Sequence, residues 1–504
     1  MDRRRLLAAG AATALLAGCG GASDPAPPPP PPPTGPDWAG LAKQLQGQLL
    51  RPGGPGFATA APVFNMLYDA TVPAAVVRCA SALDVSMALG FARRNGLAVT
   101  PRSGGHGYTG DATCTGLVID VGPLASISVD AAAGTATIGA GVKLVDVYDQ
   151  LASQGVCIPS GTCPTIGIAG ITQGGGVGVV DRAYGLTCDR LLSADVVLAD
   201  GSLVTCDATS HPDLFWALRG GGGGNFGVVV SLTFATFATA DVTSFVASFA
   251  WADAAAVIAA WQAWPATLPD TAWSGLVLGS STALASQPGL QVAGWFLGSP
   301  ADFAPIWSQF LAATAATPTS QRVQASTFRD AMLSSCQGHS VPECHLASET
   351  SGGLVARTAF VATSDFFDAA LPPAGIQALV DAVAAQQGLR SFVVLLDLMG
   401  GAIARVAADA TAFVHRDALF SAQYYLPGLH PDQAPAARAV ATALRATMSP
   451  WSSGEAYQNY LDPDLADWQQ AYYGANWARL TLVKSAYDPQ QVFRPAQGIL
   501  PATG

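Results

Sequence analysis

Two glycine-rich segments contain the side chains of this chain that could take part in chemistry. The first runs from Pro101 to Gly110 and carries His106, and the second runs from Gly161 to Gly178 and carries Cys163. Because glycine has no side chain, such loops let backbone N–H groups approach a phosphate closely. Taken alone, His106 is typical of a loop histidine and Cys163 of a small buried apolar residue. The surrounding motifs decide what these two side chains do.

The first segment also matches a dinucleotide fingerprint. Gly105, Gly107 and Gly110 have the spacing GxGxxG. In a Rossmann fold a helix must begin at the last of these glycines, whereas here a Cys/Thr/Gly stretch and a strand pattern follow. A third glycine run, from Leu218 to Val228, lacks the Lys-Ser/Thr that would follow in a P-loop. We therefore exclude both a Rossmann-type NAD site and a P-loop.

Short strands and capped helices are expected to position these loops. Ser81 is a predicted helix N-cap, because Asp84 stands three residues later, apolar positions follow and Gly96 ends the pattern. Asp200-Gly201 is a favoured hairpin dipeptide between two strand patterns. Helices are expected at 81–96, 143–153 and 212–218, and strands at 97–100, 117–121, 127–129, 136–138, 193–200, 202–206 and 228–234. This part of the chain is therefore mixed α and β.

The rest of the chain differs in composition. From about residue 241 to 455 Ala-rich helices such as 254–263 and 373–387 alternate with apolar strands such as 392–398, which predicts a second domain. The 504 residues exceed one ordinary domain of about 100 to 200 residues. Half of the residues are hydrophobic and 12% are charged, so the chain can build sizeable cores. The net charge of −11 argues against nucleic-acid binding, which needs clustered Lys and Arg.

The first 36 residues are expected to direct and tether the protein. Arg3-Arg4-Arg5, an apolar run and Leu16-Ala17-Gly18-Cys19 resemble a bacterial lipoprotein signal, in which Cys19 is diacylated and holds the protein to a membrane. A transmembrane anchor is the weaker interpretation, because an apolar run of about 13 residues is too short for a bilayer. The arginines also suggest twin-arginine export to the periplasm, a route for folded proteins. Pro27 to Pro33 predict an extended spacer.

The cysteines give one expected disulfide. Nine are present, and one would carry the lipid. In an oxidising exported compartment others can pair, and Cys336 and Cys344 are near enough in sequence to close a small loop. The connectivity of Cys79, Cys114, Cys157, Cys188 and Cys206 stays open.

At the first glycine segment the chain resembles a known family. Arg102 to Tyr108, Arg-Ser-Gly-Gly-His-Gly-Tyr, is similar to the FAD-binding motif of the berberine bridge enzyme-like family, within the vanillyl-alcohol oxidase/PCMH-type fold group. The second segment and the glycine run at 218–228 resemble the same family. So do the C-terminal stretches Tyr457 to Asp462, Tyr472 to Asn476 and Lys484 to Phe493. Residues 241–390 are covered only by position.

The resemblance implies that FAD is attached through two covalent bonds. His106 would bond to the flavin 8α carbon and Cys163 to C6. Further cofactor-binding positions are implied at Arg102, Ser103, Gly104, Gly105, Gly107, Tyr108, Ile166, Gly167, Gly170, Gly175, Gly178, Val228 and Asn459.

The expected fold class is α+β, with a PCMH-type FAD-binding domain and an α/β substrate domain that contains an antiparallel sheet. After a signal at 1–19 and a spacer at 20–36, we expect the FAD domain at 37–240. The substrate domain is expected at 241–455, and a C-terminal segment at 456–504 returns to the FAD domain.

By the same resemblance, Tyr460 would be the base that helps to take a hydride from a CH–OH group, with Asp397 beside it. A phenol with a pKa near 10 is about 0.1% ionised at pH 7, and lowering its pKa by three units takes about 4 kcal/mol. A nearby carboxylate would raise the tyrosine pKa, so Asp397 would accept the phenolic hydrogen bond or share the role of base. In the alternative interpretation Tyr460 is a core aromatic and Asp397 a turn residue.

The electron acceptor and the substrate are less constrained. Ile166 stands three residues after Cys163, where the family's oxidases have Val and its dehydrogenases have bulkier residues. This favours an acceptor other than oxygen, and oxygen stays open as the alternative. Carbohydrates and other alcohols are the expected small-molecule substrates. Two alternatives stay open: oxidative cyclisation or dehydrogenation of a natural product, and a non-catalytic surface lipoprotein that keeps the fold.

Overall fold

The computed structural model describes residues 35–281 and 287–502. The expected signal with Cys19, and most of the expected spacer, therefore lie outside the described residues. By its internal contacts the chain divides into two units, residues 1–37 and 38–504, and all the described helices and strands belong to the second. None of the described helices is long and apolar enough to cross a membrane.

A four-stranded sheet begins the second unit. Its order is β1-β2-β4-β3, in which β2, β4 and β3 run parallel. The strands are β1 (Gln48–Leu50), β2 (Ala75–Arg78), β3 (Val99–Arg102) and β4 (Leu117–Asp120), and short helices α1 (Trp38–Gln44) and α2 (Phe57–Ala60) accompany them. The loop with His106 thus follows the carboxyl end of a parallel strand, a usual place for a ligand.

Helix α3 (Ala82–Arg94) forms as the sequence predicts. The Ser81 hydroxyl accepts a hydrogen bond from the backbone N–H of Asp84 at 3.2 Å. The strand that follows begins two residues later than expected. The reason is that the Leu97 N–H still bonds to Ala92 O at the end of the helix.

A five-stranded antiparallel sheet follows, with the order β5-β6-β10-β8-β9. Its strands are β5 (Ile127–Asp130), β6 (Thr135–Gly139), β8 (Leu191–Val197), β9 (Leu203–Asp207) and β10 (Val228–Ala235). The helices here are α4 (Leu144–Ala152), α5 (Ile168–Gln173), α6 (Asp181–Tyr184) and α7 (Pro212–Ala217), and β7 (Val156–Cys157) pairs with β11 (Phe237–Ala238). The hairpin predicted at Asp200-Gly201 is confirmed. We call residues 38–238 the N-terminal module.

A seven-stranded antiparallel sheet occupies residues 242–427, with the order β15-β12-β14-β13-β17-β18-β16. Its strands are β12 (Val242–Ser248), β13 (Ala272–Ser280), β14 (Gly289–Leu297), β15 (Ser320–Ser326), β16 (Phe360–Phe367), β17 (Phe392–Leu398) and β18 (Phe420–Pro427). Together with the sheets above, this confirms the α+β class.

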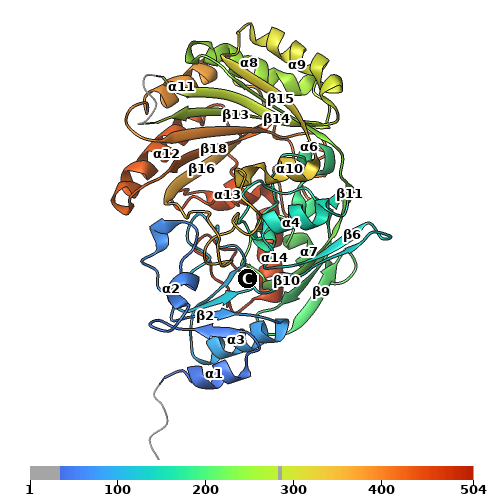
Figure 1. The fold of residues 1–504 in the computed structure, drawn as a ribbon. Coiled ribbons are helices and arrows are strands. Elements are labelled where there is room, and N and C mark those ends of the chain that lie inside the picture. The colour runs from blue at the N-terminus through green and yellow to red at the C-terminus, as the bar shows by residue number, and fades with distance from the viewer. Residues whose placement is uncertain (1–34, 282–286, 503–504) are drawn as a thin grey trace, which may run out of the picture. The chain divides into compact units, whose positions relative to one another are not determined.

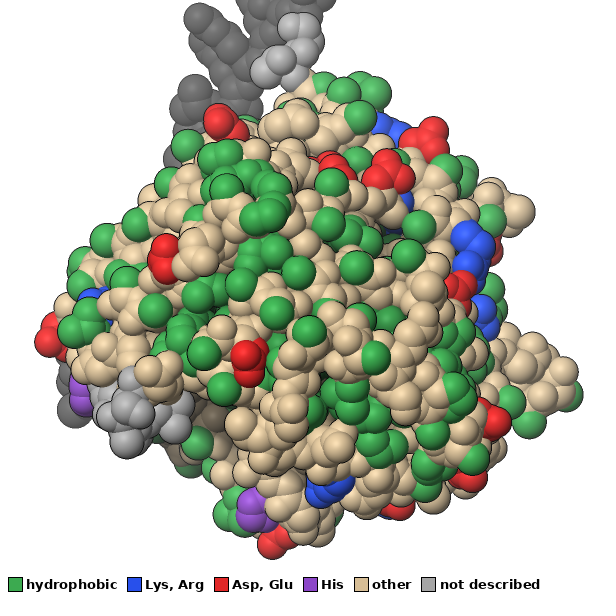
Figure 2. Space-filling model, turned by 90° about the horizontal axis from the view of Figure 1, so that it is seen from above, with side chains coloured by type: hydrophobic (Ala, Val, Ile, Leu, Met, Phe, Trp, Pro, Cys, Tyr) green, Lys and Arg blue, Asp and Glu red, His purple; other side chains and the backbone are tan. Residues whose placement is uncertain are grey.

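Four helices cover one face of this sheet (Figure 1). They are α8 (Ala254–Ala263), α9 (Pro300–Thr314), α11 (Pro373–Ala384) and α12 (Ala434–Met448). Leu276, Val394 and Leu396 on this face are buried against them in one hydrophobic cluster. Seen from above, the outer surface shows hydrophobic side chains scattered among other side chains and backbone, with few charged groups (Figure 2). A pocket of about 470 Å³, lined largely by alanines of α8 and α9, lies on this helical side.

The C-terminal segment returns to the N-terminal module. It contains α13 (Trp468–Tyr473) and α14 (Trp477–Tyr487). The buried Lys484 ammonium donates to Asn225 O at 2.6 Å and to Asp488 at 2.7 Å, and Ile499 N–H donates to the Asn225 side chain at 2.9 Å. These bonds fix the last part of the C-terminal segment against the glycine run at 218–228.

Candidate active site

His106 lies in the loop after β3, between an aromatic ring and a hydroxyl. Its ring stacks on Phe64 with ring centres 4.0 Å apart, and its Nε2 lies 2.8 Å from the Thr165 hydroxyl. Burial, and after it the positive charge of Lys143, lowers the pKa of His106 to about 3. The imidazole is therefore neutral at physiological pH, and one ring nitrogen makes no hydrogen bond to the described residues.

Cys163 is exposed, although burial raises the pKa of its thiol. Exposure of the side chain and a burial effect on its pKa are compatible if the thiol faces an open space that is enclosed by protein. A thiolate at Cys163 would raise the pKa values of Tyr108, Tyr425 and Tyr460, so these three side chains lie near Cys163.

The two glycine segments meet backbone to backbone. A Cβ atom on Gly104 would overlap Gly167 N and Thr165 O, and a Cβ on Gly167 would overlap the Ser103 hydroxyl. Gly105 has a φ of 69°, a left-handed conformation that favours glycine. By contrast, a Cβ on Gly170 would meet no atom within 4 Å. The segments therefore lock into each other, while Gly170 on α5 borders open space.

The buried ammonium group of Lys143 stabilises the loop that carries His106. Lys143 Nζ donates to Ser103 O at 2.9 Å and to Gly141 O at 3.2 Å. It also lies 3.6 Å from the Glu349 carboxylate, and both side chains are largely buried. Lys143 thus joins the first glycine segment to a distant part of the chain.

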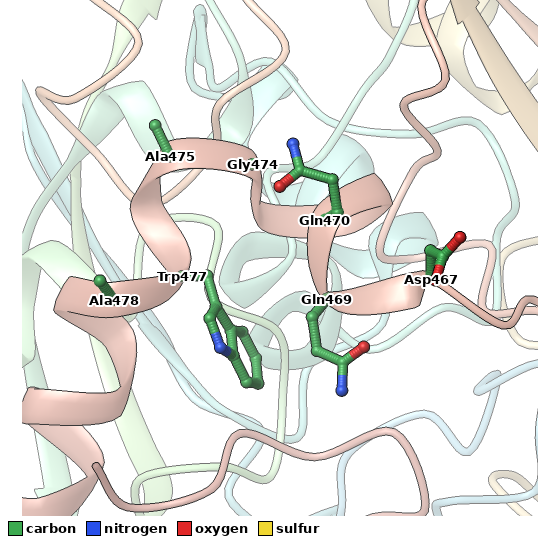
Figure 3. Close-up of a pocket in the computed structure, with 7 residues that line it drawn as sticks. All are labelled: Asp467, Gln469, Gln470, Gly474, Ala475, Trp477 and Ala478. Atoms are coloured by element: carbon green, nitrogen blue, oxygen red, sulfur yellow. The ribbon is translucent and has the colours of Figure 1, made fainter. Parts of the chain in front are cut away.

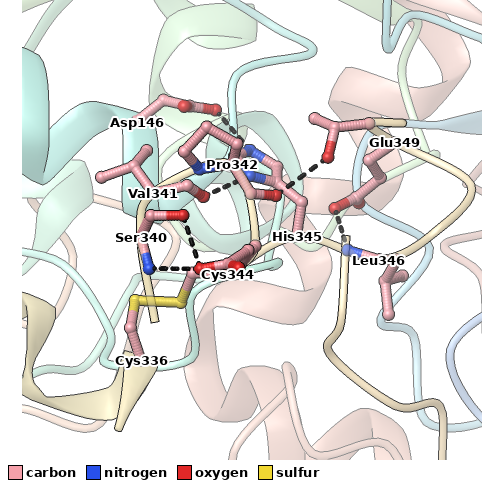
Figure 4. Close-up of a disulfide and its surroundings, with 11 residues drawn as sticks. Asp146, Cys336, Ser340, Val341, Pro342, Cys344, His345, Leu346 and Glu349 are labelled. Carbon is pink, nitrogen blue, oxygen red and sulfur yellow. Dashed lines mark hydrogen bonds and ion pairs between the residues drawn. A yellow bond between two sulfur atoms is a disulfide. The ribbon is translucent and has the colours of Figure 1, made fainter. Parts of the chain in front are cut away.

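Glu349 closely follows a loop that a disulfide closes, as shown in Figure 4. Cys336 and Cys344 are bonded, which confirms the expected pair. The neighbouring His345 lies 2.9 Å from Asp146 on α4 through its Nε2. This hydrogen bond, with the side chain of Asp146, raises the pKa of His345 against the effect of its burial. The disulfide segment is therefore attached to the helix that begins after Lys143.

Tyr460 lies between two other tyrosines. Its ring stacks on Tyr108 with ring centres 5.2 Å apart and meets the edge of Tyr457 at 4.8 Å. Burial, and then the charges of Tyr108 and Asp397, raise the pKa of Tyr460 well above its ordinary value. The described residues thus supply no group that turns Tyr460 into a phenolate at neutral pH.

Asp397 lies within β17, so the alternative that it is a turn residue is wrong. It faces Gly275 on β13 and Ser421 on β18. Burial raises the pKa of its carboxyl group to about 6. Neither the Asp397 carboxylate nor the Tyr460 hydroxyl makes a side-chain hydrogen bond within the described chain, so the expected bond between them is absent and both groups can receive a substrate.

Tyr457 and Gln458 hold the turn that presents Tyr460. The Tyr457 oxygen accepts bonds from Gly176 N–H, Val177 N–H and the Asn459 amide at 2.9 to 3.1 Å. Burial raises the pKa of Tyr457 to about 12 despite these donors. The Gln458 side chain lies 3.2 Å from a ring nitrogen of His415 and donates to Gly220 O at 2.7 Å. The turn is therefore tied to both the second and the third glycine segments.

Several predicted cofactor residues are engaged with the protein itself. Arg102 donates to Asp120 at 3.0 Å and to Ala61 O at 3.1 Å, and Ser103 donates to Ala140 O at 2.5 Å. Val228 is buried in β10 opposite Val197. Three further predicted residues, Ile166, Gly175 and Gly178, belong to the second glycine segment. Asn459 lies beside this segment, and its amide donates to Ile171 O at 3.0 Å. For all of these, contact with a cofactor stays a prediction.

Sequence reasoning missed four residues that the fold brings to this place. Phe64 precedes the glycine segments by about forty positions, and Lys143 opens α4. Gln423 and Tyr425 come from β18, and the Gln423 amide donates to the Tyr108 hydroxyl at 2.7 Å. Only the alternation of β18 could have indicated that Gln423 and Tyr425 share a face.

A separate pocket lies in the C-terminal segment. It measures about 420 Å³ and is lined by residues of α13 and α14, among them Asp467, Gln470 and Trp477 (Figure 3). The residues that line it include none of those around His106 and Cys163. Among the described residues, no group of three or more His, Cys, Asp or Glu side chains could hold a metal ion.

The geometry around His106 and Cys163 fits FAD. Gly104 and Gly167 bring the two glycine loops together, and backbone N–H groups of such loops can bind a diphosphate. Gly170 and the Cys163 thiol each border open space, and the neutral imidazole of His106 lies on the first loop. Bound FAD would supply the acceptor for a hydride.

Comparisons with known proteins agree with this cofactor. Residues 73–207 match the model of an FAD binding domain, and residues 456–500 match the berberine and berberine-like family. An FAD-linked oxidoreductase of Bacillus subtilis, YgaK, is 32% identical over 464 residues, which are 91% of this chain and 98% of the relative.

Two oligosaccharide oxidases are similar as well. The xylooligosaccharide oxidase of Thermothelomyces thermophilus is 31% identical and covers 85% of this chain and 88% of its own length. The solved glucooligosaccharide oxidase of Acremonium strictum, described as revealing a novel flavinylation, has a TM-score of 0.83 and 26% identity over 94% of this chain and all of its own. The chain therefore belongs to the berberine bridge enzyme-like family of FAD-linked oxidoreductases.

Proposed function

We propose that the protein carries FAD on both His106 and Cys163 and oxidises the CH–OH group of an alcohol or carbohydrate. The proposal is carried by Tyr460, which lies near enough to both Asp397 and the exposed Cys163 for their charges to act on it. The His106 imidazole, on the loop that also carries Tyr108, is neutral. The names of the oligosaccharide oxidases among the relatives support a CH–OH donor.

The two attachment residues differ in how readily they can form a bond to the flavin. A neutral imidazole can act as a nucleophile without losing a proton first, and the pKa of His106 is about 3. Cys163 must lose its thiol proton, and burial raises the pKa of that thiol. In this proposal the His106 bond therefore forms more readily than the Cys163 bond.

Asp397 and Tyr460 would share the work on the substrate hydroxyl. At pH 7 the carboxyl group, with a pKa of about 6, is mostly ionised, whereas Tyr460 keeps its proton. Asp397 is then the group that accepts the hydroxyl proton, and the Tyr460 hydroxyl orients the substrate oxygen or relays its proton to Asp397. This assigns to Asp397 a larger part than the family resemblance alone implies.

The attachment is tested on denaturing gels. Flavin fluorescence should stay with the wild-type polypeptide and with His106→Ala or Cys163→Ala alone, and it should disappear in the double variant. Colourless wild-type protein after expression with ample FAD would contradict the proposed cofactor linkage.

The chemistry is tested by flavin bleaching under nitrogen with a panel of oligosaccharides, aryl alcohols and aliphatic alcohols. Tyr460→Phe and Asp397→Asn should each slow bleaching by the best substrate. If both variants bleach as fast as wild type, the assignment of the proton acceptor is wrong. Reoxidation by oxygen and by a quinone should then be compared, since Ile166 favours an acceptor other than oxygen.

We also propose export and lipid attachment at Cys19. The disulfide between Cys336 and Cys344 supports an oxidising compartment. Cys19→Ala should move the protein from the membrane fraction to the soluble fraction of the cell envelope. Wild-type protein that is found only in soluble fractions would contradict the anchor.

A further inference from the structure

The two faces of the seven-stranded sheet have different neighbours: helices pack on one face, and Asp397 lies on the other. Side chains alternate along a strand, so every second residue of β13 and β17 lies under the helices and the others lie on the opposite face. Leu276, Val394 and Leu396 take the helical side and are fully buried. Asp397 lies on the opposite face, which we call the Asp397 face.

The neighbours of Asp397 on this face follow from the register. Two residues before it on β17, Leu395 stands opposite Val277 on β13 and Gln423 on β18. Two residues further, Val393 stands opposite Gly279 and Tyr425. Next to Asp397 the two central strands therefore present Val277 and Leu395 side by side, and then Val393 beside Gly279.

These aliphatic side chains are not packed into a hydrophobic core of the described chain. Val277, Val393 and Leu395 are only partly buried although β13 and β17 are inner strands of the sheet. None of the three belongs to a hydrophobic cluster of the described chain or packs against one. An apolar surface beside a reactive carboxylate is therefore left for a ligand to cover.

The border of this surface is aromatic and uncharged. The Tyr425 ring lies 5.2 Å from Phe360, and Phe360 meets the edge of Tyr108 at 4.8 Å. Gln423 uses its amide N–H on the Tyr108 hydroxyl, which leaves its carbonyl oxygen as an isolated acceptor. Apart from Asp397, no residue on this face of β13, β17 or β18 carries a charge.

We infer that the substrate is an uncharged alcohol whose CH–OH group is joined to an aliphatic or aromatic skeleton, and not an oligosaccharide. The inference rests on the proposed oxidation of a CH–OH group and narrows its substrate class. In that reaction the carbon loses a hydride to FAD and the hydroxyl loses its proton, so a carbonyl group is formed.

The physical reason is the cost of an unpaired hydroxyl group. A sugar ring carries a hydroxyl on most of its carbons, and each needs a hydrogen-bond partner when water is removed. Val277, Val393 and Leu395 offer none, whereas they can cover a hydrocarbon chain or an aryl ring. The fold shared with the oligosaccharide oxidases does not decide this, because specificity depends on the side chains at the site.

Wild-type holoenzyme tests the inference directly. Flavin bleaching under nitrogen should be measured with cinnamyl alcohol and 2-octanol against xylobiose and cellobiose. We expect kcat/KM to be at least about tenfold higher for the apolar alcohols. If the disaccharides are the better substrates, the proposed CH–OH oxidation stands and the inference is overturned. If none of the four bleaches the flavin, both fail.

Two variants locate the effect. Val393→Thr and Leu395→Asn keep the side-chain size roughly constant and add polarity, so KM for the apolar alcohols should rise about tenfold while kcat changes little. Val323→Thr, the same substitution on the exposed edge strand β15, is the matched control and should leave KM unchanged.

A binding measurement that does not depend on turnover shows whether these variants have lost affinity for an apolar ligand. Perturbation of the flavin absorbance by n-octylbenzene, which has no hydroxyl group, should titrate in wild type and weaken about tenfold in Val393→Thr. Thermal unfolding confirms that each variant is folded. An unchanged titration in folded Val393→Thr and Leu395→Asn would overturn the inference.

Discussion

The N-terminal module presents His106 and Cys163 on loops without regular structure, whereas the seven-stranded sheet presents Asp397 from within a strand. In the module, position depends on close backbone approach, as at Gly104 and Gly167, and on buried polar bonds such as those of Lys143. In the sheet, position follows from register. Changes in the module should therefore disturb the cofactor and the fold together, while changes on the Asp397 face should alter chemistry on an intact scaffold.

A pair of glycine substitutions tests this contrast most severely. Gly104→Ala should abolish flavin incorporation, because its Cβ would overlap the backbone of Gly167 and Thr165. Gly279→Ala on β13 should keep full flavin content, since its Cβ would lie 3.9 Å from the nearest atom. The flavin-to-protein absorbance ratio of the purified proteins measures both. Equal flavin-to-protein ratios in the two variants would contradict the expected difference between the N-terminal module and the sheet.

Asp397→Asn should lower kcat by about 100- to 10,000-fold, because it removes the proton acceptor. In wild type kcat/KM should fall about tenfold per pH unit below the pKa of about 6 of Asp397, since a protonated carboxyl group cannot accept a proton. The pH profile of anaerobic bleaching measures this. A flat acidic limb in wild type would point to another base.

Asp397→Asn should not be less stable to unfolding than wild type. Burial raises the pKa of Asp397 in the folded state, so the carboxylate costs folding free energy above about pH 6, and an amide avoids that cost. The unfolding midpoint of Asp397→Asn at pH 7 should equal or exceed that of wild type. At a pH well below the carboxyl pKa of unfolded chains the difference should vanish.

Lys143→Met should destabilise the module by about 3 kcal/mol, because it leaves Glu349 buried without its partner. Glu349→Gln in the same chain should restore part of that loss. A double-mutant cycle on denaturant unfolding measures the coupling. Lys143→Met should also raise the pKa of His106, but His106 stays neutral at pH 7 because burial is the larger cause of its low pKa.

The smallest effect is expected at the disulfide. Replacing Cys336 and Cys344 with Ser opens a short loop and should reduce the free energy of unfolding by about 2–3 kcal/mol. Flavin content should persist, since Glu349 and His345 keep their partners on α4 and the Lys143 side chain. Loss of flavin in the folded double variant would show that the disulfide itself holds the first glycine segment in place.

Signals from residues close in sequence were sufficient to predict several elements of the fold. The Ser81 cap, the Asp200-Gly201 hairpin and the Cys336–Cys344 pair each depend on residues that are close in sequence, and all three are confirmed. The roles of His106 and Cys163 in holding FAD came from the family resemblance and stay a prediction.

Contacts between distant residues could not be predicted in the same way. The bond from Gln423 to Tyr108 joins positions 315 residues apart, and it requires the register of β17 with β18. The pairing of Lys143 with Glu349 has no signal in either neighbourhood. The pKa of Tyr460 depends on burial between Tyr108 and Tyr457, which only the assembled fold determines.

The bonds from the Tyr457 oxygen to the second glycine segment have a consequence for biosynthesis. Tyr457 follows Gly176 by 281 positions, so the ribosome needs about 15 to 55 s to supply it after the glycine segment has emerged. During that interval the N-terminal module lacks Tyr460 and its turn. Completion of the site is therefore an event of the nearly finished polypeptide. Export by a route that carries folded proteins would come after it.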